Sequence, residues 1–257
     1  MTPIAVQLYT VREQAAKDLP RVLRSISELG FVGVELYGRF DIAPADLKKV
    51  MRDLGLRFTS AHVPFPSGRE ASRILDEQAE LGVPAIAWSL EPEEFRTTDA
   101  IARGVDRVNE GAVNARDYGI RLAYHNHEAE FSNTFNGLTA HQILLDLVEP
   151  DVLVELDLYW AAVGGADPAE VLRDLGDRVP FVHVKDGPGK SRDDVMVAVG
   201  QGSLDIAAAL TANPAVRWHI VELDRFDGDI FDALRDSYDF LVGGGYSTGQ
   251  AGSATSD

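Results

Sequence analysis

The eight residues YHNHEAEF, from Tyr124 to Phe131, place two imidazoles, an amide and two carboxylates directly after an apolar run. Imidazoles and carboxylates together suit metal binding and proton transfer, although a solvated loop can have the same composition. The preceding run, IRLA, is typical of a buried strand. If the stretch belongs to a site, residues of the same kinds should follow other buried strands.

Other apolar runs do end in such residues. Aromatic rings close the first and fourth runs, and carboxylates or imidazoles, one with a lysine, close the others: Tyr9, Glu35, His62, Trp88, Asp157, His183 with Lys185, and Glu222 with Asp224. A lone histidine at a strand end is more often structural than functional. The repetition at the same end of so many strands favours a shared site.

A divalent metal is the chemistry that suits this set. Buried carboxylates repel one another unless a cation compensates them. The chain has no cysteine, so His, Asp, Glu and water are the available ligands, which suit Mn, Mg, Co, Fe or Zn. Asp157, His183 and Glu222 come from three consecutive strands and could converge. Strand alternation places the polar residues of the fifth run on two faces without selecting the inner one: Tyr124, Asn126, Glu128 and Glu130 on one, His125 and His127 on the other.

The elements that must position these residues alternate regularly along the chain. Apolar runs such as residues 4–10 are predicted to be strands, and amphipathic stretches such as residues 17–30 are predicted to be helices. Eight such units predict a single α/β domain, a (β/α)8 TIM barrel over residues 1–242. A doubly wound sheet is the alternative, but no Gly-rich dinucleotide fingerprint follows the first strand, so no nucleotide cofactor is expected. Residues 243–257, rich in Gly, Ser and Thr, predict a disordered tail.

Composition narrows the class of partner. The chain has 257 residues, 45% hydrophobic and 25% charged, with a net charge of −17. That charge and the lack of a basic run argue against nucleic acid. The first residues do not resemble a signal peptide, and no run approaches the roughly 18 apolar residues of a membrane span. A cytoplasmic location without a membrane partner is the expectation.

Seven motifs, taken together, resemble the xylose-isomerase-like barrels known as sugar phosphate isomerases/epimerases. The similarity extends from Ile4 to Leu241, and the motifs follow successive predicted strands: VQLYTVR, GVELY, SAHVPF, YHNHEAEF, ELDLYWAAVGGADP, HVKDG and VELD. The combination is also similar to inosose dehydratases and to enzymes acting on 3-keto-sugars.

The resemblance implies a divalent metal held by side chains of strands five to eight. It assigns Asp157, His183 and Glu222 as ligands, with Glu130 as the fifth-strand ligand. His125 is the rival, because in a gapless overlay it falls where relatives have the liganding Glu. Relatives often read GEG before the seventh helix, whereas this chain has Gln201 in GQG.

The implied activity is isomerisation or epimerisation of a sugar or keto-sugar through a metal-stabilised enediolate. A lyase reaction, by dehydration or 3-keto-glycoside cleavage, would use the same site. The candidate catalytic residues are Glu130, Glu222, His125, His127 and Lys185, and the candidate substrate-binding residues are Tyr9, Glu35, His62, Trp88 and Trp160. Lys185 could instead form a salt bridge to Asp157 or Glu155.

Two further readings compete with a sugar enzyme. An endonuclease IV-like nuclease would need a richer ligand cluster and a basic surface. In a non-catalytic sugar-binding barrel without a metal, the carboxylates would only repel one another. No Gly-rich phosphate loop at a helix start stands out, so an unphosphorylated sugar or polyol is the expected substrate. A homo-oligomer is compatible with the sequence.

Overall fold

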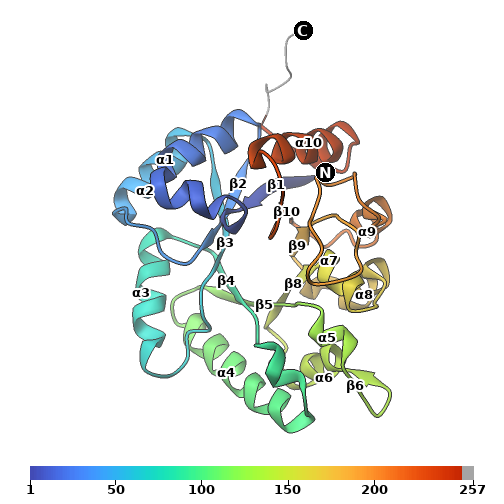
Figure 1. Ribbon diagram of the computed structural model, residues 1–257. Coiled ribbons are helices and arrows are strands. Elements are labelled where there is room, and N and C mark those ends of the chain that lie inside the picture. Colours follow the sequence, from blue (N-terminus) through green and yellow to red (C-terminus); the bar gives the residue numbers. More distant parts are fainter. Residues whose placement is uncertain (251–257) are drawn as a thin grey trace.

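The computed structural model describes residues 1–250 and shows a closed parallel barrel surrounded by helices (Figure 1). The barrel strands, in the order in which they pair, are β1 (Thr2–Gln7), β2 (Gly33–Tyr37), β3 (Arg57–His62), β4 (Ala85–Trp88), β5 (Arg121–His125), β8 (Leu153–Asp157), β9 (Phe181–Val184) and β10 (Trp218–Val221). β10 pairs in parallel with β1 and closes the ring. The predicted (β/α)8 barrel is therefore confirmed.

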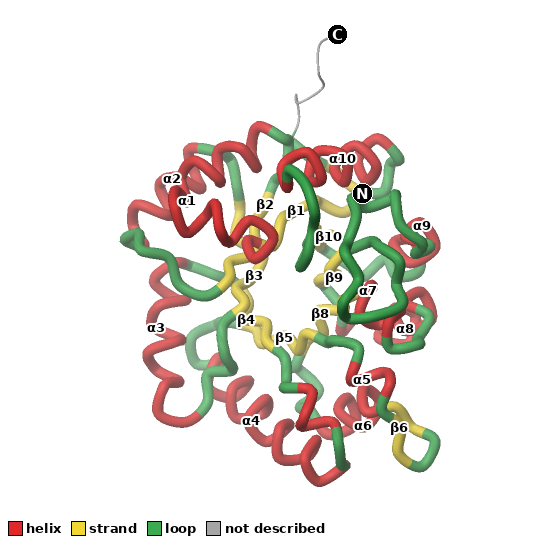
Figure 2. Tube along the Cα trace, viewed as in Figure 1, coloured by secondary structure: helices red, strands yellow, loops and turns green. Residues whose placement is uncertain are grey.

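The helices lie outside the ring of strands, as Figure 2 shows. They are α1 (Arg12–Glu28), α2 (Pro44–Asp53), α3 (Ala71–Leu81), α4 (Thr98–Arg116), α5 (Ala129–Ser132), α6 (Ala140–Leu147), α7 (Leu158–Val163), α8 (Pro168–Leu175), α9 (Ile206–Thr211) and α10 (Ile230–Gly243). A short hairpin of β6 (Thr134–Phe135) and β7 (Leu138–Thr139) projects between α5 and α6. In the described chain, no helix is long and apolar enough to cross a membrane.

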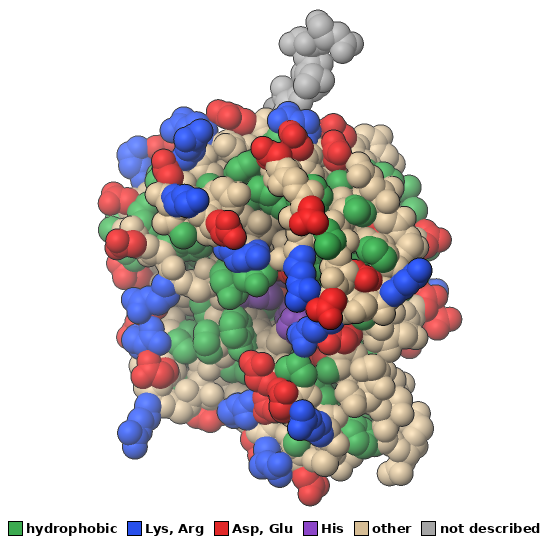
Figure 3. All heavy atoms as spheres, in the orientation of Figure 1, with side chains coloured by type: hydrophobic (Ala, Val, Ile, Leu, Met, Phe, Trp, Pro, Cys, Tyr) green, Lys and Arg blue, Asp and Glu red, His purple; other side chains and the backbone are tan. Residues whose placement is uncertain are grey.

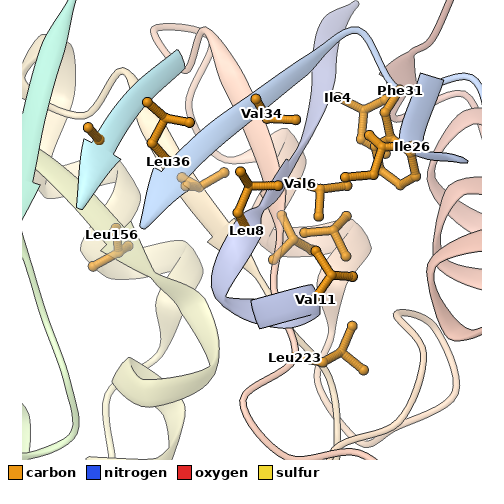
Figure 4. Close-up of a cluster of buried hydrophobic side chains, with 14 of the residues drawn as sticks. Ile4, Val6, Leu8, Val11, Ile26, Phe31, Val34, Leu36, Leu156 and Leu223 are labelled. Atoms are coloured by element: carbon orange, nitrogen blue, oxygen red, sulfur yellow. The ribbon is translucent and has the colours of Figure 1, made fainter. Parts of the chain in front are cut away.

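Alternation along the strands separates the outer core from the barrel interior. On β1, Ile4 and Val6 face outward and pack with residues such as Ile26 and Phe31 (Figure 4). Ala5, on the other face, joins an inner cluster formed largely by alanines of β4 and β5. These alanines, together with Phe181 and Ile220, fill the lower barrel, and the polar strand ends lie above them.

α1 begins earlier than the predicted helix over residues 17–30. After a 3-10 turn (Leu8–Val11), the chain enters α1 at Arg12 and leaves helical geometry at Asp18, where φ is −158° and ψ is 82°. The Asp18 carboxylate accepts the backbone N–H of Arg21 at 3.0 Å, so it caps the second, predicted part of the helix. The additional first turn carries Arg12 at the mouth of the barrel.

The expected disordered tail is wrong for the residues up to Gln250. β11 (Ser247–Thr248) pairs in parallel with the start of β1, and the Ser247 hydroxyl contacts His219 Nδ1 at 2.8 Å. The Gln250 amide donates to the carbonyls of Phe31 and Leu54 at 3.0 and 3.2 Å. Composition did not predict this segment because backbone and amide hydrogen bonds, with a ring contact between Tyr246 and Phe240, hold it rather than a periodic apolar face. The rest of the expected tail, residues 251–257, lies outside the described residues.

Candidate metal centre and cavity

The inward-facing polar residues form a buried layer above the alanines of the barrel. Its titratable members are Glu35 of β2, His62 of β3, His125 of β5, Glu155 and Asp157 of β8, His183 and Lys185 at the end of β9, and Glu222 just after β10. Strand alternation explains the membership, because His125 shares the inner face with Ala123 and Asp157 shares it with Glu155. The sequence left open which face of the fifth strand points into the barrel, and the structure places His125 on that inner face.

One group of donors lies at the upper level, towards the mouth. His125, Asp157, His183 and Glu222 each offer a ligand atom, and these atoms lie within 4.8 Å of one another. His183 Nδ1 is 2.7 Å from Glu222 Oε2, and His125 Nε2 is 3.8 Å from Asp157 Oδ2. Two imidazoles and two carboxylates without sulfur fit Zn, Mn, Co or Fe, so the donor set suits the metal that the resemblance implies.

A second group lies beneath the first and shares two histidines with it. Glu155 Oε2 is 2.5 Å from His62 Nε2, 3.1 Å from His125 Nδ1 and 3.4 Å from His183 Nε2. His125 and His183 therefore face the upper group with one ring nitrogen and the lower carboxylates with the other. A carboxylate on the second nitrogen commonly fixes the tautomer and orientation of a metal-binding histidine.

Glu35 completes the lower level. Its carboxylate is 2.6 Å from His183 Nε2 and accepts hydrogen bonds from the Gln7 amide and the Ser60 hydroxyl at 2.7 and 2.5 Å. Burial alone would raise the pKa of Glu35, but the charges of His62 and His183 outweigh it and lower the pKa to about 2. Glu35 does not line the cavity, so the structure does not bring this expected substrate-binding residue to the substrate space.

The pKa values of neighbouring buried groups are shifted in opposite directions. Burial, together with the negative charge of Glu35, raises the pKa of Glu155 to about 7. Burial lowers the pKa of His125 well below its ordinary value, and the positive charges of His183 and His62 add to that effect. Opposed shifts within one small cluster are typical of functional sites.

Lys185 Nζ contacts three carboxylates at the upper level. It lies 2.9 Å from Asp157 Oδ2, 2.7 Å from Glu222 Oε2 and 2.8 Å from Asp224 Oδ2. Burial opposes its charge, but these carboxylates outweigh burial and hold the pKa of Lys185 well above its usual value. The salt-bridge interpretation is therefore correct for Asp157 but not for Glu155, and Lys185 also lines the cavity.

Glu130 lies in neither donor group, so the structure does not support it as the fifth-strand ligand. It is on α5, beyond the end of β5, where its carboxylate accepts hydrogen bonds from the Tyr124 hydroxyl at 2.7 Å and the His127 backbone N–H at 3.1 Å. Burial raises the pKa of Glu130 to about 8, so the group is protonated at neutral pH. His125, rather than Glu130, is the residue of the YHNHEAEF stretch that belongs to the upper donor group.

A cavity of about 390 Å³ opens above the upper group. Four predicted substrate-binding residues line it, as do two of the predicted catalytic histidines: Tyr9, His62, Trp88, Trp160, His125 and His127. Burial and the positive charge of Lys185 lower the pKa of His127 to about 3, so this imidazole is neutral at pH 7. Figure 3 shows histidine side chains at the bottom of the hollow in this face.

Sequence reasoning missed some members of the site. Glu155 lies two residues before Asp157, and alternation alone would have placed it on the same inner face. The cavity also has arginines on its wall, Arg12, Arg192 and Arg225, which carry no spacing signal because they come from distant segments. Gln201 of the GQG stretch donates to Asp236 of α10 at 3.0 Å.

The fold agrees with the comparisons to known proteins. A family model described as a xylose isomerase-like TIM barrel matches residues 23–241, and the chain belongs to that family. One relative is an inosose dehydratase of Geobacillus kaustophilus (strain HTA426). It is 27% identical over 217 residues, which cover 74% of this chain and 68% of the relative.

Two solved structures share the fold. A sugar phosphate isomerase/epimerase from Parabacteroides distasonis ATCC 8503 has a TM-score of 0.81 at 24% identity, and the match covers 96% of this chain and 100% of the other. The IOLI protein, solved with a zinc atom, has a TM-score of 0.75 at 19% identity and covers 94% of this chain and 97% of its own. At these identities the likeness shows the fold alone.

Proposed function

We propose that this protein is a divalent-metal-dependent isomerase or epimerase acting on a sugar or keto-sugar. The observation that carries the proposal is the upper donor group of His125, Asp157, His183 and Glu222, which lies below the cavity at the C-terminal ends of consecutive barrel strands. Active sites of this fold are built at that end of the barrel.

The four residues of the upper donor group would hold the metal; Zn, Mn, Co and Fe suit its two imidazoles, whereas Mg, which prefers oxygen ligands, fits less well. Zinc has indirect support from the zinc atom in the IOLI structure. When bound, such a cation supplies Lewis acidity that polarises a substrate carbonyl and acidifies the neighbouring C–H.

The residues of the chain supply binding and proton transfer. Glu222, whose pKa Lys185 and His183 hold well below its usual value against the effect of burial, is the candidate base. The Lys185 ammonium compensates the charges of Asp157 and Glu222, and it can donate to a substrate hydroxyl in exchange for its contact with Asp224, which is outside the donor group. The ring faces of Trp88 and Trp160 on the cavity wall suit the C–H surface of a sugar.

A lyase reaction is the second candidate, and the inosose dehydratase relative favours it. Removal of the same proton could be followed by loss of a β-hydroxyl group instead of return of the proton. The two outcomes use the same base and the same metal ligands. They differ in product, because dehydration lowers the substrate mass by one water.

Both candidates are tested on inositols, ketoses and 3-keto-glycosides with Mn, Co and Mg in deuterated water. Solvent deuterium at a substrate carbon with no change in composition supports the isomerase, and loss of water supports the lyase. Neither deuterium incorporation nor a product from any compound, with metal bound, would contradict the proposed activity.

Asp157→Ala removes one carboxylate of the upper group, so we expect it to abolish metal retention and turnover together. Metal content by elemental analysis and the deuterium assay are measured on the same preparation. Asp174→Ala is the control, since Asp174 is exposed on α8. A full metal complement and normal activity in Asp157→Ala would show that the site is assigned wrongly.

A further inference from the structure

Three guanidinium groups line the cavity of a chain that is strongly acidic overall. The chain has 41 Asp and Glu against 24 Lys and Arg, yet Arg12, Arg192 and Arg225 all contribute to this one wall. They come from the start of α1, the segment between β9 and α9, and the residues after β10. In Figure 3, Lys and Arg side chains gather around the hollow in which the histidines are visible.

Arg12 is held in place by neutral groups. Its guanidinium donates to the backbone carbonyls of Tyr9 and Asp224 at 2.8 and 3.2 Å and lies 4.0 Å from the centre of the Tyr9 ring. Among residues 1–250, no carboxylate forms an ion pair with it. Its orientation is therefore fixed while its charge remains uncompensated by a carboxylate, which prepares it for an anion.

The other two arginines each have one carboxylate partner, which is a half-buried Glu128 for Arg192 and an exposed Asp193 for Arg225. Arg192 Nη1 lies 3.5 Å from Glu128, and Arg225 Nη1 lies 3.0 Å from Asp193, with about half of each arginine side chain exposed. Exposed ion pairs of this kind contribute little free energy, so a ligand can replace them at small cost.

The carboxylates of the same wall are already engaged. Asp194 accepts the backbone N–H groups of Lys190 and Ser191 at 2.8 and 3.0 Å, and Glu91 takes part in a capping box with Glu94. Asp224, deeper in the cavity, contacts Lys185. These carboxylates thus have hydrogen-bond partners within the protein, whereas the Arg12 guanidinium has no carboxylate partner among the described residues.

We propose that these arginines form a subsite for an anionic group, a carboxylate or a phosphate, carried by the substrate. The inference rests on the proposed function, and it narrows the substrate class to acidic or phosphorylated sugars. Guanidinium groups match the planar or tetrahedral oxygens of such groups with paired N–H donors. A cavity of about 390 Å³ is within the range of small-molecule sites, so one ligand can reach both the metal centre and the wall.

The proposed subsite fits an anionic substrate, whereas the sequence favoured an unphosphorylated sugar or polyol. That expectation followed from the absence of a Gly-rich phosphate loop, which is a local motif. The arginines lie at positions 12, 192 and 225 and converge only through the closure of the barrel between β10 and β1.

The test compares three unreactive polyols in metal-loaded protein: glucitol, gluconate and glucitol 6-phosphate. Calorimetry gives their affinities for wild type, Arg12→Gln, Arg192→Gln and Arg225→Gln. Arg235→Gln, an exposed arginine of α10, removes the same charge away from the cavity and serves as the matched control. Circular dichroism and the affinity for glucitol confirm that each variant is folded.

We expect at least one anion to bind about tenfold or more tightly than glucitol, because a charge-assisted hydrogen bond contributes on that order. Arg12→Gln should remove most of this preference by lowering the affinity for the anions far more than the affinity for glucitol, while Arg235→Gln should behave as wild type. Whichever of gluconate and glucitol 6-phosphate binds with the higher affinity shows whether the subsite prefers a carboxylate or a phosphate. Equal affinity for the three polyols, or failure of all three to bind, would overturn the subsite, as would equal losses in Arg12→Gln and Arg235→Gln.

The outcomes separate this inference from the proposed function. Metal binding and deuterium exchange on neutral ketoses, without an anion preference, would contradict only the subsite. An anion preference that depends on Arg12, without metal binding or exchange on any compound, would contradict only the metal-dependent activity.

Discussion

Glu155 and Asp157 lie two positions apart on β8, and the difference in depth gives them different contacts. Asp157 Oδ1 accepts the backbone N–H of Trp160 at 2.9 Å, which leaves Oδ2 directed to the upper group. Glu155 Oε2 instead contacts the three imidazoles of the lower group, and its other oxygen is buried without a hydrogen-bond partner. If the upper group holds the proposed metal, Asp157 would be a ligand and Glu155 would orient the histidines.

Glu130 offers a prediction that separates a buried acid from a metal ligand. Its pKa rises from 4.5 to about 8 on burial, so the folded protein binds the proton more tightly than the unfolded chain. Stability should therefore fall as pH rises from about 4.5 to 8. Glu130→Gln, which cannot ionise, should be close to wild type in unfolding free energy at pH 5 and more stable than wild type at pH 9, by up to a few kcal/mol.

Urea unfolding of both proteins across this pH range measures the effect, and elemental analysis gives the metal content. Full metal retention in Glu130→Gln and loss in His125→Ala would agree with the donor group in the structure. A metal-free Glu130→Gln with an unchanged pH profile would return Glu130 to the ligand set.

At the level of elements, the segment between β9 and α9 builds one wall of the cavity around Asp186. The Asp186 carboxylate accepts the backbone N–H groups of Gly187, Gly200 and Gly202 at 2.8, 3.0 and 2.9 Å. A Cβ atom at Gly202 would lie 2.0 Å from Asp186 Oδ1, so the close approach requires glycine. The glycines of GQG therefore serve the shape of this segment, which carries Arg192.

Asp186→Asn should disturb both stability and the cavity wall. An amide cannot accept on its nitrogen side, so at least one buried N–H loses its acceptor, at a cost of about 1–3 kcal/mol. Thermal unfolding should show a lower midpoint than in wild type, and anion binding should weaken more than glucitol binding because Arg192 lies in the segment. Asp177→Asn, at an exposed position, is the control. An unchanged midpoint and an unchanged anion preference would show that Asp186 does not organise the wall.

The predictable elements are those in which apolar residues recur with a regular period along the sequence. Apolar runs and amphipathic stretches predicted the eight barrel strands, and strand ends predicted Asp157, His183 and Glu222 as neighbours. Parity within β5 was not predictable because the sequence contains no fixed reference for the inner face. The three cavity arginines, Arg12, Arg192 and Arg225, come together through contacts between segments distant in sequence, and so does the pairing of β11 with β1. No local sequence pattern predicts such contacts.

For the whole molecule, the charge of −17 and the buried carboxylates make divalent cations act in two ways. Cations can bind weakly to the acidic surface, or tightly to the upper donor group, and both would stabilise the folded state. The two contributions are separable because removing one buried ligand leaves the surface almost unchanged.

Mn²⁺ should therefore raise the thermal midpoint of wild type far more than that of Asp157→Ala. A concentration 100 times the dissociation constant stabilises by about 2.7 kcal/mol, which corresponds to about 5–10 °C for a chain of this size. Differential scanning fluorimetry after chelation, with Mn²⁺ then added at constant ionic strength, measures the shift. The variant should show only the smaller surface contribution, and excess chelator should reverse the wild-type shift. Equal shifts in the two proteins would mean that the cation acts through the surface charge and that the buried donor group holds no metal.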